Sequence, residues 1–315
     1  MICKSPVALL FSAALLVPLH SFAAGSVPEA IMAADAKGLF KSAYSSVDQR
    51  KSVSVQDFAG RKAAKIELRY EWKGGPLDWN RFGKPGYGQR SQFNEKESKR
   101  MVPNKDYWLT VSVFIPPELE QVKASLQLFD LKYVVDNNGS VPAMDFRVFP
   151  EGEIHAGVGF VTALSGEWKC GTYRNAEGGK TPICNRMENA GYMGKQAALS
   201  GRWIEMVAHL RFAKENGIVN IWFDKKPIYG VTGDTLKIAK FVSFKFGPYR
   251  IEMDGDPGPV ALYYSHVARG GTCEALGVEG CSDLYAAPVA EGLQNLADTW
   301  SNPFNELDEM RAKGL

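Results

Sequence analysis

The stretch Tyr107-Trp108-Leu109-Thr110-Val111-Ser112-Val113-Phe114-Ile115 places an apolar residue at every second position and stops at Pro116-Pro117. Side chains alternate between the two faces of a β-strand, so one face of this segment is wholly apolar. Its β-branched and aromatic content also favours a strand, and the two prolines end it. The pattern predicts a strand with one face in a hydrophobic core.

Similar segments recur along the chain without long helices between them. This order predicts an all-β fold, a jelly roll or concanavalin A-like sandwich of two antiparallel sheets, rather than a parallel α/β sheet. Only short peripheral helices are expected, over residues 28–45, 289–300 and 305–313. Further strands are expected at 63–70, 125–133, 144–149, 203–212, 218–223, 241–246 and 261–267, with a turn at 213–217.

Composition agrees with a globular chain of one domain. The 315 residues are 45% hydrophobic, 23% charged and 11% aromatic. The formal net charge is only +2, so no global polycation exists to hold nucleic acid. We expect a signal peptide at 1–24, a β-domain at 25–285 and a helical tail at 286–315.

The first residues have the layout of a secretory signal peptide. Lys4 precedes an apolar run over 7–19, and Ala23-Ala24 offers a cleavage site. The run is too short for a comfortable membrane span. We therefore expect a secreted or periplasmic protein that makes no membrane contact after cleavage and is a monomer.

Four cysteines remain once Cys3 leaves with the signal peptide. An even number in an exported chain favours two disulfides, and the shortest loops give Cys170–Cys184 and Cys273–Cys281. Three pairings are formally open. The spacing does not resemble a zinc site, and no metal or cofactor is expected. The loops 136–139 and 254–256 carry Ca²⁺-type ligands but continue into no full Ca²⁺ motif.

Several of the predicted strands carry a polar or cationic face opposite an apolar one. Taken one by one, these faces are typical of ordinary solvated sheet. If they belong to one sheet, they form a surface suited to an anionic, hydroxyl-rich ligand. The residues expected to share faces in this way are Arg90 with Gln92, Gln127 with Phe129, Asp145 with Arg147, and Lys245 with Gly247 and Tyr249.

An ordered set of motifs resembles the heparin lyase I-like and glucuronan lyase group of polysaccharide lyases, with a wider likeness to jelly-roll alginate lyases. The resemblance covers about residues 60–270 and implies β-elimination on an anionic polysaccharide containing uronic acid. The motifs are Gln89-Arg90-Ser91-Gln92-Phe93, the Tyr107–Pro117 strand, Leu126-Gln127-Leu128-Phe129, the hairpin from Gly201-Arg202-Trp203 to Trp222-Phe223-Asp224, and Lys245-Phe246-Gly247-Pro248-Tyr249-Arg250.

The resemblance also implies roles for individual residues. Arg90, Gln127 and Lys245 are the residue types that offset charge developing on the sugar carboxylate. Tyr249 is the expected base, its pKa lowered by a neighbouring cation such as Lys245 or Arg250. The residues expected to bind substrate are Gln92, Phe129, Arg147, Arg250 and His155.

Two positions depart from the family pattern. Gln92 stands where an acid is usual, and Phe129 stands where a Gln-x-His motif places histidine. A phenyl ring could stack on a sugar but cannot carry a proton. His209 falls in a predicted hairpin and is expected to be structural.

Two other classes remain open. A non-catalytic carbohydrate-binding protein of the same fold would keep the polar surface and lose the proton carrier. A glycoside hydrolase would need two carboxylates, for which Glu151 with Glu153, or Asp254 with Asp256, have suitable spacing.

Overall fold

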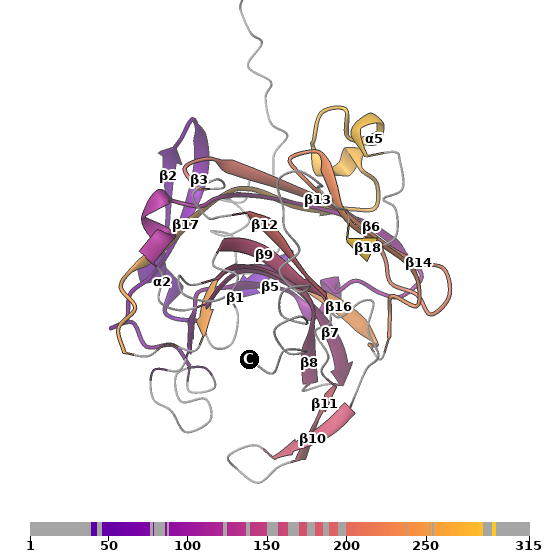
Figure 1. Cartoon of the computed structure of the whole chain (residues 1–315), viewed down its shortest axis with the longest axis horizontal. Helices are drawn as coiled ribbons and strands as arrows, with labels where there is room; N and C mark the ends of the chain where they lie inside the picture. Colours follow the sequence, from indigo (N-terminus) through magenta and orange to yellow (C-terminus); the bar gives the residue numbers. More distant parts are fainter. Residues whose placement is uncertain are drawn as a thin grey trace, which may run out of the picture.

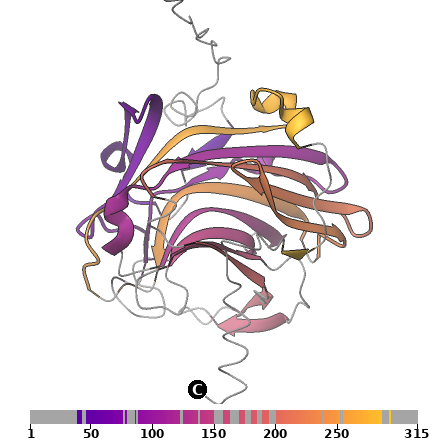
Figure 2. The ribbon, with the colours of Figure 1, turned by 45° about the horizontal axis from the view of Figure 1, so that its top comes forward.

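The computed structural model shows a sandwich of two curved antiparallel sheets (Figures 1 and 2). In Figure 2 the inner sheet arches, and its concave side faces away from the outer sheet. The residues described are 39–42, 46–75, 78, 86, 88–121, 125–136, 139–149, 157–162, 170–174, 180–184, 189–194, 200–237, 239–251, 253, 255–285 and 292–293.

The inner sheet has eight strands in the order β1-β5-β16-β7-β8-β9-β12, with β4 paired to a second part of β16. The consecutive pairs β7–β8 and β8–β9 are antiparallel, whereas β16 joins them from far along the sequence. The strands are β1 (Phe40–Ser42), β4 (Gly88–Arg90), β5 (Phe93–Glu95), β7 (Ser125–Asp136), β8 (Gly139–Phe149), β9 (Gly157–Thr162), β12 (Asn189–Gly194) and β16 (Phe241–Ile251).

The outer sheet also has eight strands, in the order β18-β15-β14-β13-β6-β17-β3-β2. Its centre is the pairing of β6 with β13 and β17. The strands are β2 (Val53–Phe58), β3 (Arg61–Leu68), β6 (Asp106–Phe114), β13 (Trp203–Arg211), β14 (Gly217–Phe223), β15 (Lys226–Gly233), β17 (Val260–Gly270) and β18 (Gly292–Leu293).

The remaining elements are small. Strands β10 and β11 form a separate antiparallel hairpin. Within the described residues, no helix has the length and apolar character needed to cross a bilayer. The bounds are β10 (Cys170–Arg174), β11 (Lys180–Cys184), α2 (Gln49–Ser52), α5 (Cys281–Leu284), η2 (Glu97–Lys99), η3 (Pro117–Gln121) and η4 (Glu274–Leu276).

The hydrophobic core lies between the sheets and is rich in aromatic rings. Phe146 of the inner sheet stacks on Phe223 of the outer sheet with ring centroids 4.7 Å apart. Phe246 contacts Tyr264 across the same interface at 5.5 Å. These contacts fix which face of each strand points inward, because the alternate residues must then lie on the opposite face.

The strands and hairpin expected from alternation are confirmed, with ends that differ by a few residues. The expected helix over 28–45 is wrong where it can be compared, because Phe40–Ser42 forms a strand paired with β5. Gly292–Leu293 likewise pairs with β15, where a helix was expected. Both short segments gain ladder hydrogen bonds at a sheet edge, which local propensity does not reveal.

The position of Phe129 corrects one expectation. A register shift in β7 between Gln127 and Phe129 places two successive residues, Leu128 and Phe129, toward the core. Phe129 is 1% exposed and stacks on Phe146 at 4.9 Å. It therefore does not share a face with Gln127 and does not line the polar surface.

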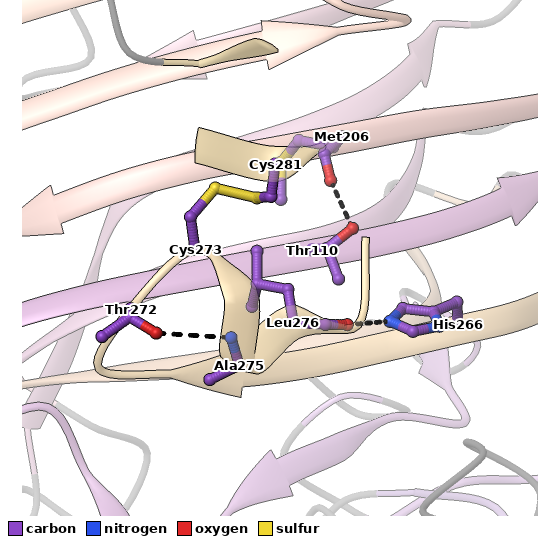
Figure 3. The surroundings of a disulfide bond; sticks show 8 residues. All are labelled: Thr110, Met206, His266, Thr272, Cys273, Ala275, Leu276 and Cys281. Atoms are coloured by element: carbon purple, nitrogen blue, oxygen red, sulfur yellow. Dashed lines mark hydrogen bonds between the residues drawn. A yellow bond between two sulfur atoms is a disulfide. The ribbon is translucent and has the colours of Figure 1, made fainter. Parts of the chain in front are cut away.

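The expected disulfide Cys273–Cys281 is present (Figure 3). It joins η4 to α5 over the outer sheet, where a small second core contains Val207, Trp222 and Tyr285. His266 bonds the Leu276 carbonyl at 2.8 Å beside it.

For the other expected disulfide, the register of β10 and β11 sets the backbones of Cys170 and Cys184 directly opposite each other. Their side chains lie outside the described residues.

A buried carboxylate ties the two sheets together. Glu95 of β5 is 1% exposed. One of its oxygens accepts from Arg269 Nη1 of the outer sheet at 2.5 Å, and the other accepts from the Phe244 backbone N–H at 3.0 Å. The second bond satisfies an N–H on the edge of β16 where β5 ends. Burial raises the pKa of Glu95 to about 7, although the Arg269 charge opposes the shift.

We predict that this carboxyl makes stability pH-dependent. Since its pKa rises on folding from 4.5 to about 7, the folded state binds the proton more tightly between those values. The Glu95 contribution to the free energy of unfolding should therefore fall as pH rises through this window, by on the order of 3 kcal/mol. Urea unfolding of wild type and Glu95→Gln at several pH values measures it. A wild-type advantage that grows with pH over this window contradicts the prediction.

Candidate active site

The predicted polar residues meet on the concave face of the inner sheet. The ladder aligns Arg90, Tyr249, Gln127 and Arg147 in one row across β4, β16, β7 and β8. A second row aligns Asn94, Lys245, Asp130 and Asp145. Phe244, Phe246 and Phe129 fill the core from the opposite side of these strands. We call the surface formed by the two rows together with Gln92, Lys132 and Asp78 the concave polar face.

The tightest cluster on this face contains Arg90, Tyr249 and Asp78. The guanidinium carbon of Arg90 lies 4.0 Å from the centre of the Tyr249 ring. Asp78 accepts from Arg90 Nε and Nη2, each at 2.5 Å, and from the Tyr249 hydroxyl at 3.1 Å. The phenol is thus held between a cation over its ring and a carboxylate at its hydroxyl.

Burial acts against the charge of Arg90, but the hydrogen bonds and charge of Asp78 outweigh it. The pKa of Arg90 is therefore raised, and the guanidinium stays charged. Tyr249 is 6% exposed and Asp78 is 2% exposed, so this charge balance is set in a poorly hydrated place.

Two glutamines extend the cluster along the sheet. Gln92 accepts from Arg90 Nη1 at 3.3 Å and donates from Nε2 to Gln127 Oε1 at 3.5 Å. The same Nε2 lies 3.3 Å from the Gly247 carbonyl oxygen. At position 92, where the lyases that this sequence resembles usually carry an acid, this chain therefore has an amide that connects Arg90 to Gln127.

Gly247 explains how β16 can contact both β4 and β5. It has φ +109°, within the region that disfavours residues with a Cβ. A Cβ at this position would lie 2.3 Å from the Ser91 carbonyl oxygen and 3.0 Å from Gln92 Cα. This close approach accompanies the register shift between Phe246 and Tyr249. It sets the spacing between Tyr249 and the Arg90–Gln92 segment.

Lys245 is half-buried and lies in the register position between Asn94 and Asp130. Burial lowers its pKa to about 8, while the nearby Asp130 charge opposes the shift. The ammonium therefore changes charge at mildly alkaline pH.

Two further cations of the face are held by acids. Arg147 donates to both carboxylate oxygens of Asp145, at 2.6 and 2.7 Å. Lys132 Nζ lies 2.7 Å from Asp130 Oδ2.

Arg250 does not reach this surface, which corrects its expected substrate contact and its expected effect on Tyr249. It points to the other side of β16 and is fully buried. Its guanidinium donates to Gln89 Oε1 at 3.0 and 2.5 Å and to the Gly258 carbonyl at 2.5 Å. Arg250 therefore fixes the end of β16.

The histidines give no proton carrier on the described part of this face. His209 lies in the outer sheet, bonds Asp106 at 2.9 Å and stacks on Trp108 at 4.5 Å, in agreement with a structural role. His266 also belongs to the outer sheet. His155 lies outside the described residues.

No group of three or more His, Cys, Asp or Glu residues arranged for a metal ion occurs in the described part of the chain. Of the acidic loops considered, Asp256 accepts from the Gly258 N–H at 2.8 Å, a turn contact. The carboxylate pair Glu151 and Glu153, residue Asp254 and positions 137–138 lie outside the described residues.

The sequence analysis missed Asp78 and Asp130. Asp78 follows Gly74-Gly75, its backbone N–H donates to the Gly75 carbonyl at 3.1 Å, and a segment without a recognisable sequence pattern separates it from Arg90. Asp130 is displaced from the expected alternation by the β7 register shift. Its position two residues before Lys132 was the available signal, because i and i+2 share a face of a strand.

Comparisons with known proteins identify the family of this chain. A family model described as polysaccharide lyase matches residues 34–268. The chain belongs to this polysaccharide lyase family. A search of curated proteins finds no match.

Solved structures similar to this chain include three lyases. One is an endo-β-1,4-glucuronan lyase from Trichoderma reesei, at 15% identity over 73% of this chain and 92% of that chain, with a TM-score of 0.47. The alginate lyase AlyC3 has 13% identity, 72% and 78% coverage and a TM-score of 0.45. An alginate lyase from Pseudomonas aeruginosa has 13% identity, 70% and 88% coverage and a TM-score of 0.42.

We predict that Gly247→Ala separates β16 from the Arg90–Gln92 segment. The new Cβ would meet backbone atoms, which cannot move aside as a flexible side chain can. Unfolding should become easier by about 3 kcal/mol or more, because steric overlap adds to φ strain. Chemical denaturation measures the loss.

The matched control is Gly233→Ala. Gly233 has φ +94° but nothing within 4 Å of a Cβ, so only the strain of about 1–2 kcal/mol applies. Equal losses for the two variants would show that the close approach to Ser91 has no energetic weight.

Proposed function

We propose that this polysaccharide lyase cleaves a uronic-acid-containing polysaccharide by β-elimination on the concave polar face. The observation that carries the proposal is the Arg90 guanidinium 4.0 Å from the Tyr249 ring centre, with Gln127 opposite Tyr249 in the ladder. A phenol, a cation and an amide donor thus meet at one point of the sheet.

The reaction needs a proton to leave the carbon next to the sugar carboxylate. That proton is weakly acidic while the carboxylate is charged, since its removal places more negative charge on the same group. Lys245 supplies a cation and Gln127 an amide donor that can offset this charge, and Arg90, although paired with Asp78, adds N–H donors beside Tyr249. Their attachment to neighbouring strands limits the reorganisation that the protein must undergo.

Tyr249 is the proposed base. In the elimination, the phenolate takes the α-proton, the C–C double bond forms, and the 4-O-glycosidic bond breaks. The same phenol then protonates the departing oxygen. Asp78 disfavours phenolate through its negative charge, so Arg90 and Lys245 must offset it. Because Tyr249 is 6% exposed, substrate must displace part of the cover that Asp78 and Arg90 provide.

We also propose that the chain is exported. The disulfide Cys273–Cys281 is typical of oxidising compartments and supports this location. The apolar run at 7–19 supports a cleaved signal peptide, with a single catalytic domain after it.

We predict that Tyr249→Phe lowers the rate of elimination by about 10²–10⁴-fold, because it removes the group that transfers the proton. The assay follows ultraviolet absorbance of the unsaturated sugar on a panel of polyuronates. Tyr263→Phe is the control, since Tyr263 lies in the outer sheet and stacks on Phe58.

An unchanged rate in Tyr249→Phe would exclude this tyrosine as the base. Binding of every polymer by wild type without absorbance would indicate a non-catalytic binding protein. Release of reducing sugar without absorbance would indicate hydrolysis.

A second prediction concerns pH. Lys245 is charged below its pKa of about 8 and neutral above it. If its charge stabilises the carboxylate, its deprotonation should lower kcat/KM above pH 8 relative to Lys245→Arg, by about tenfold per pH unit, because both enzymes depend on ionisation of the same Tyr249. Lys245→Arg keeps the charge and should lack this relative decline. Lys226→Arg, at an exposed site of the outer sheet, should leave it in place. A limb that rises through pH 8 and disappears in Lys245→Arg would instead assign Lys245 as a base.

A further inference from the structure

Three cations of the concave polar face each stand above a carboxylate that is almost inaccessible to solvent. The side chains of Arg90 and Asp78 are 16% and 2% exposed, and those of Arg147 and Asp145 are 15% and 0% exposed. Those of Lys132 and Asp130 are 14% and 0% exposed. The three cations lie on three different strands, β4, β7 and β8, and in each pair the acid is more deeply buried than the cation.

This arrangement changes what each cation offers to a ligand. Asp78 and Asp145 each engage two nitrogens of their arginine, so the edge that best fits a substrate carboxylate is already occupied. The acids are buried and weakly screened by solvent, so they cancel most of the positive charge above them. Each pair therefore presents donors and acceptors with little net charge, which suits sugar hydroxyls.

Lys245 differs from these three cations. Within the described residues, no carboxylate oxygen lies within ion-pair distance of its Nζ. The concave polar face as defined above holds four cations, Arg90, Lys132, Arg147 and Lys245, against three acids, Asp78, Asp130 and Asp145. The next residue of the second row, Lys41, is paired with Glu97. The described part of the face carries a net charge of about +1, centred on Lys245, which lies on the same face of β16 as Tyr249.

Building on the function proposed above, we propose that the substrate carries its uronic acids spaced by uncharged sugars. One carboxylate binds beside Lys245 and Tyr249, and the paired side chains on either side bind neutral, hydroxyl-bearing residues. A polymer with a carboxylate on every sugar would bring adjacent negative charges over Asp130 and Asp145, where no unpaired cation among the described residues offsets them.

The test uses two polymers with the same backbone that differ in the fraction of sugars carrying a carboxylate, and therefore in the mean spacing of the charges. The first is polyglucuronate with every carboxyl intact, and the second is the same polymer with half of its carboxyls reduced to glucose. We expect kcat/KM, measured from absorbance of the unsaturated product, to be at least tenfold higher on the half-reduced polymer. A rate that falls as carboxyls are removed overturns the inference. If neither these polymers nor an unsulfated alternating uronate–hexosamine polymer gives unsaturated product, the proposed function itself fails.

A variant tests the role of the paired acid. Asp145→Asn keeps the shape of the side chain and removes the carboxylate charge that Arg147 contacts. The preference for the half-reduced polymer should fall at least threefold. Asp224→Asn is the matched control, because Asp224 pairs with Arg202 at 2.5 Å in the outer sheet. An unchanged preference in folded Asp145→Asn contradicts the assignment.

Salt dependence gives a readout on the wild-type protein that does not require any variant to fold. The slope of log KM against log salt increases with the number of ion pairs made to a polyanion. One available cation predicts a slope of about one. A slope of about four would show that the paired cations also bind carboxylates, and would overturn the inference.

Discussion

Strand β16 must bury apolar side chains on one face and present polar side chains on the other. The packing of Phe244 and Phe246 against the outer sheet meets the first requirement. Once these rings are buried, Lys245 must face the concave side. Gly247 then allows the strand to pass close to Ser91 and continue to Tyr249 on the same side. Hydrophobic packing in the core therefore determines the positions of Lys245 and Tyr249, although the phenylalanine rings lie on the opposite side of the strand.

Asp78 has two opposing effects on the cluster that it forms with Arg90 and Tyr249. It orients both Arg90 and Tyr249 and compensates a buried guanidinium, which would otherwise be costly to desolvate. The same charge makes the phenol harder to ionise. A tyrosine held in this way has a fixed position in the free protein, and its reactivity depends on what the substrate changes around it.

Periodicity was sufficient to predict most of the sandwich, because each long strand buries one face and the apolar residues must then alternate. It also assigned Arg90, Gln127, Lys245 and Tyr249 to the polar faces of their strands, and the resemblance to polysaccharide lyases grouped them into one site. It failed at Phe129, because a β-bulge reverses alternation and leaves no mark in composition. It failed at Arg250, since a buried arginine bonded to Gln89 looks the same in sequence as one facing a ligand. Asp78 could not be placed, because the segment between it and Arg90 has no recognisable pattern and its other partner, Tyr249, lies 171 residues along the chain.

The cap formed by η4 and α5 has a consequence for handling the protein. Its disulfide closes a short segment over the outer sheet, whereas Tyr249 belongs to the inner sheet. Chemical reduction would loosen the cover of Trp222 while leaving the Phe-rich interior between the layers intact. Protein prepared in a reducing cytosol would therefore keep its activity but expose an aromatic surface that promotes aggregation. Aggregation, rather than activity, would then show whether the two cysteines are oxidised.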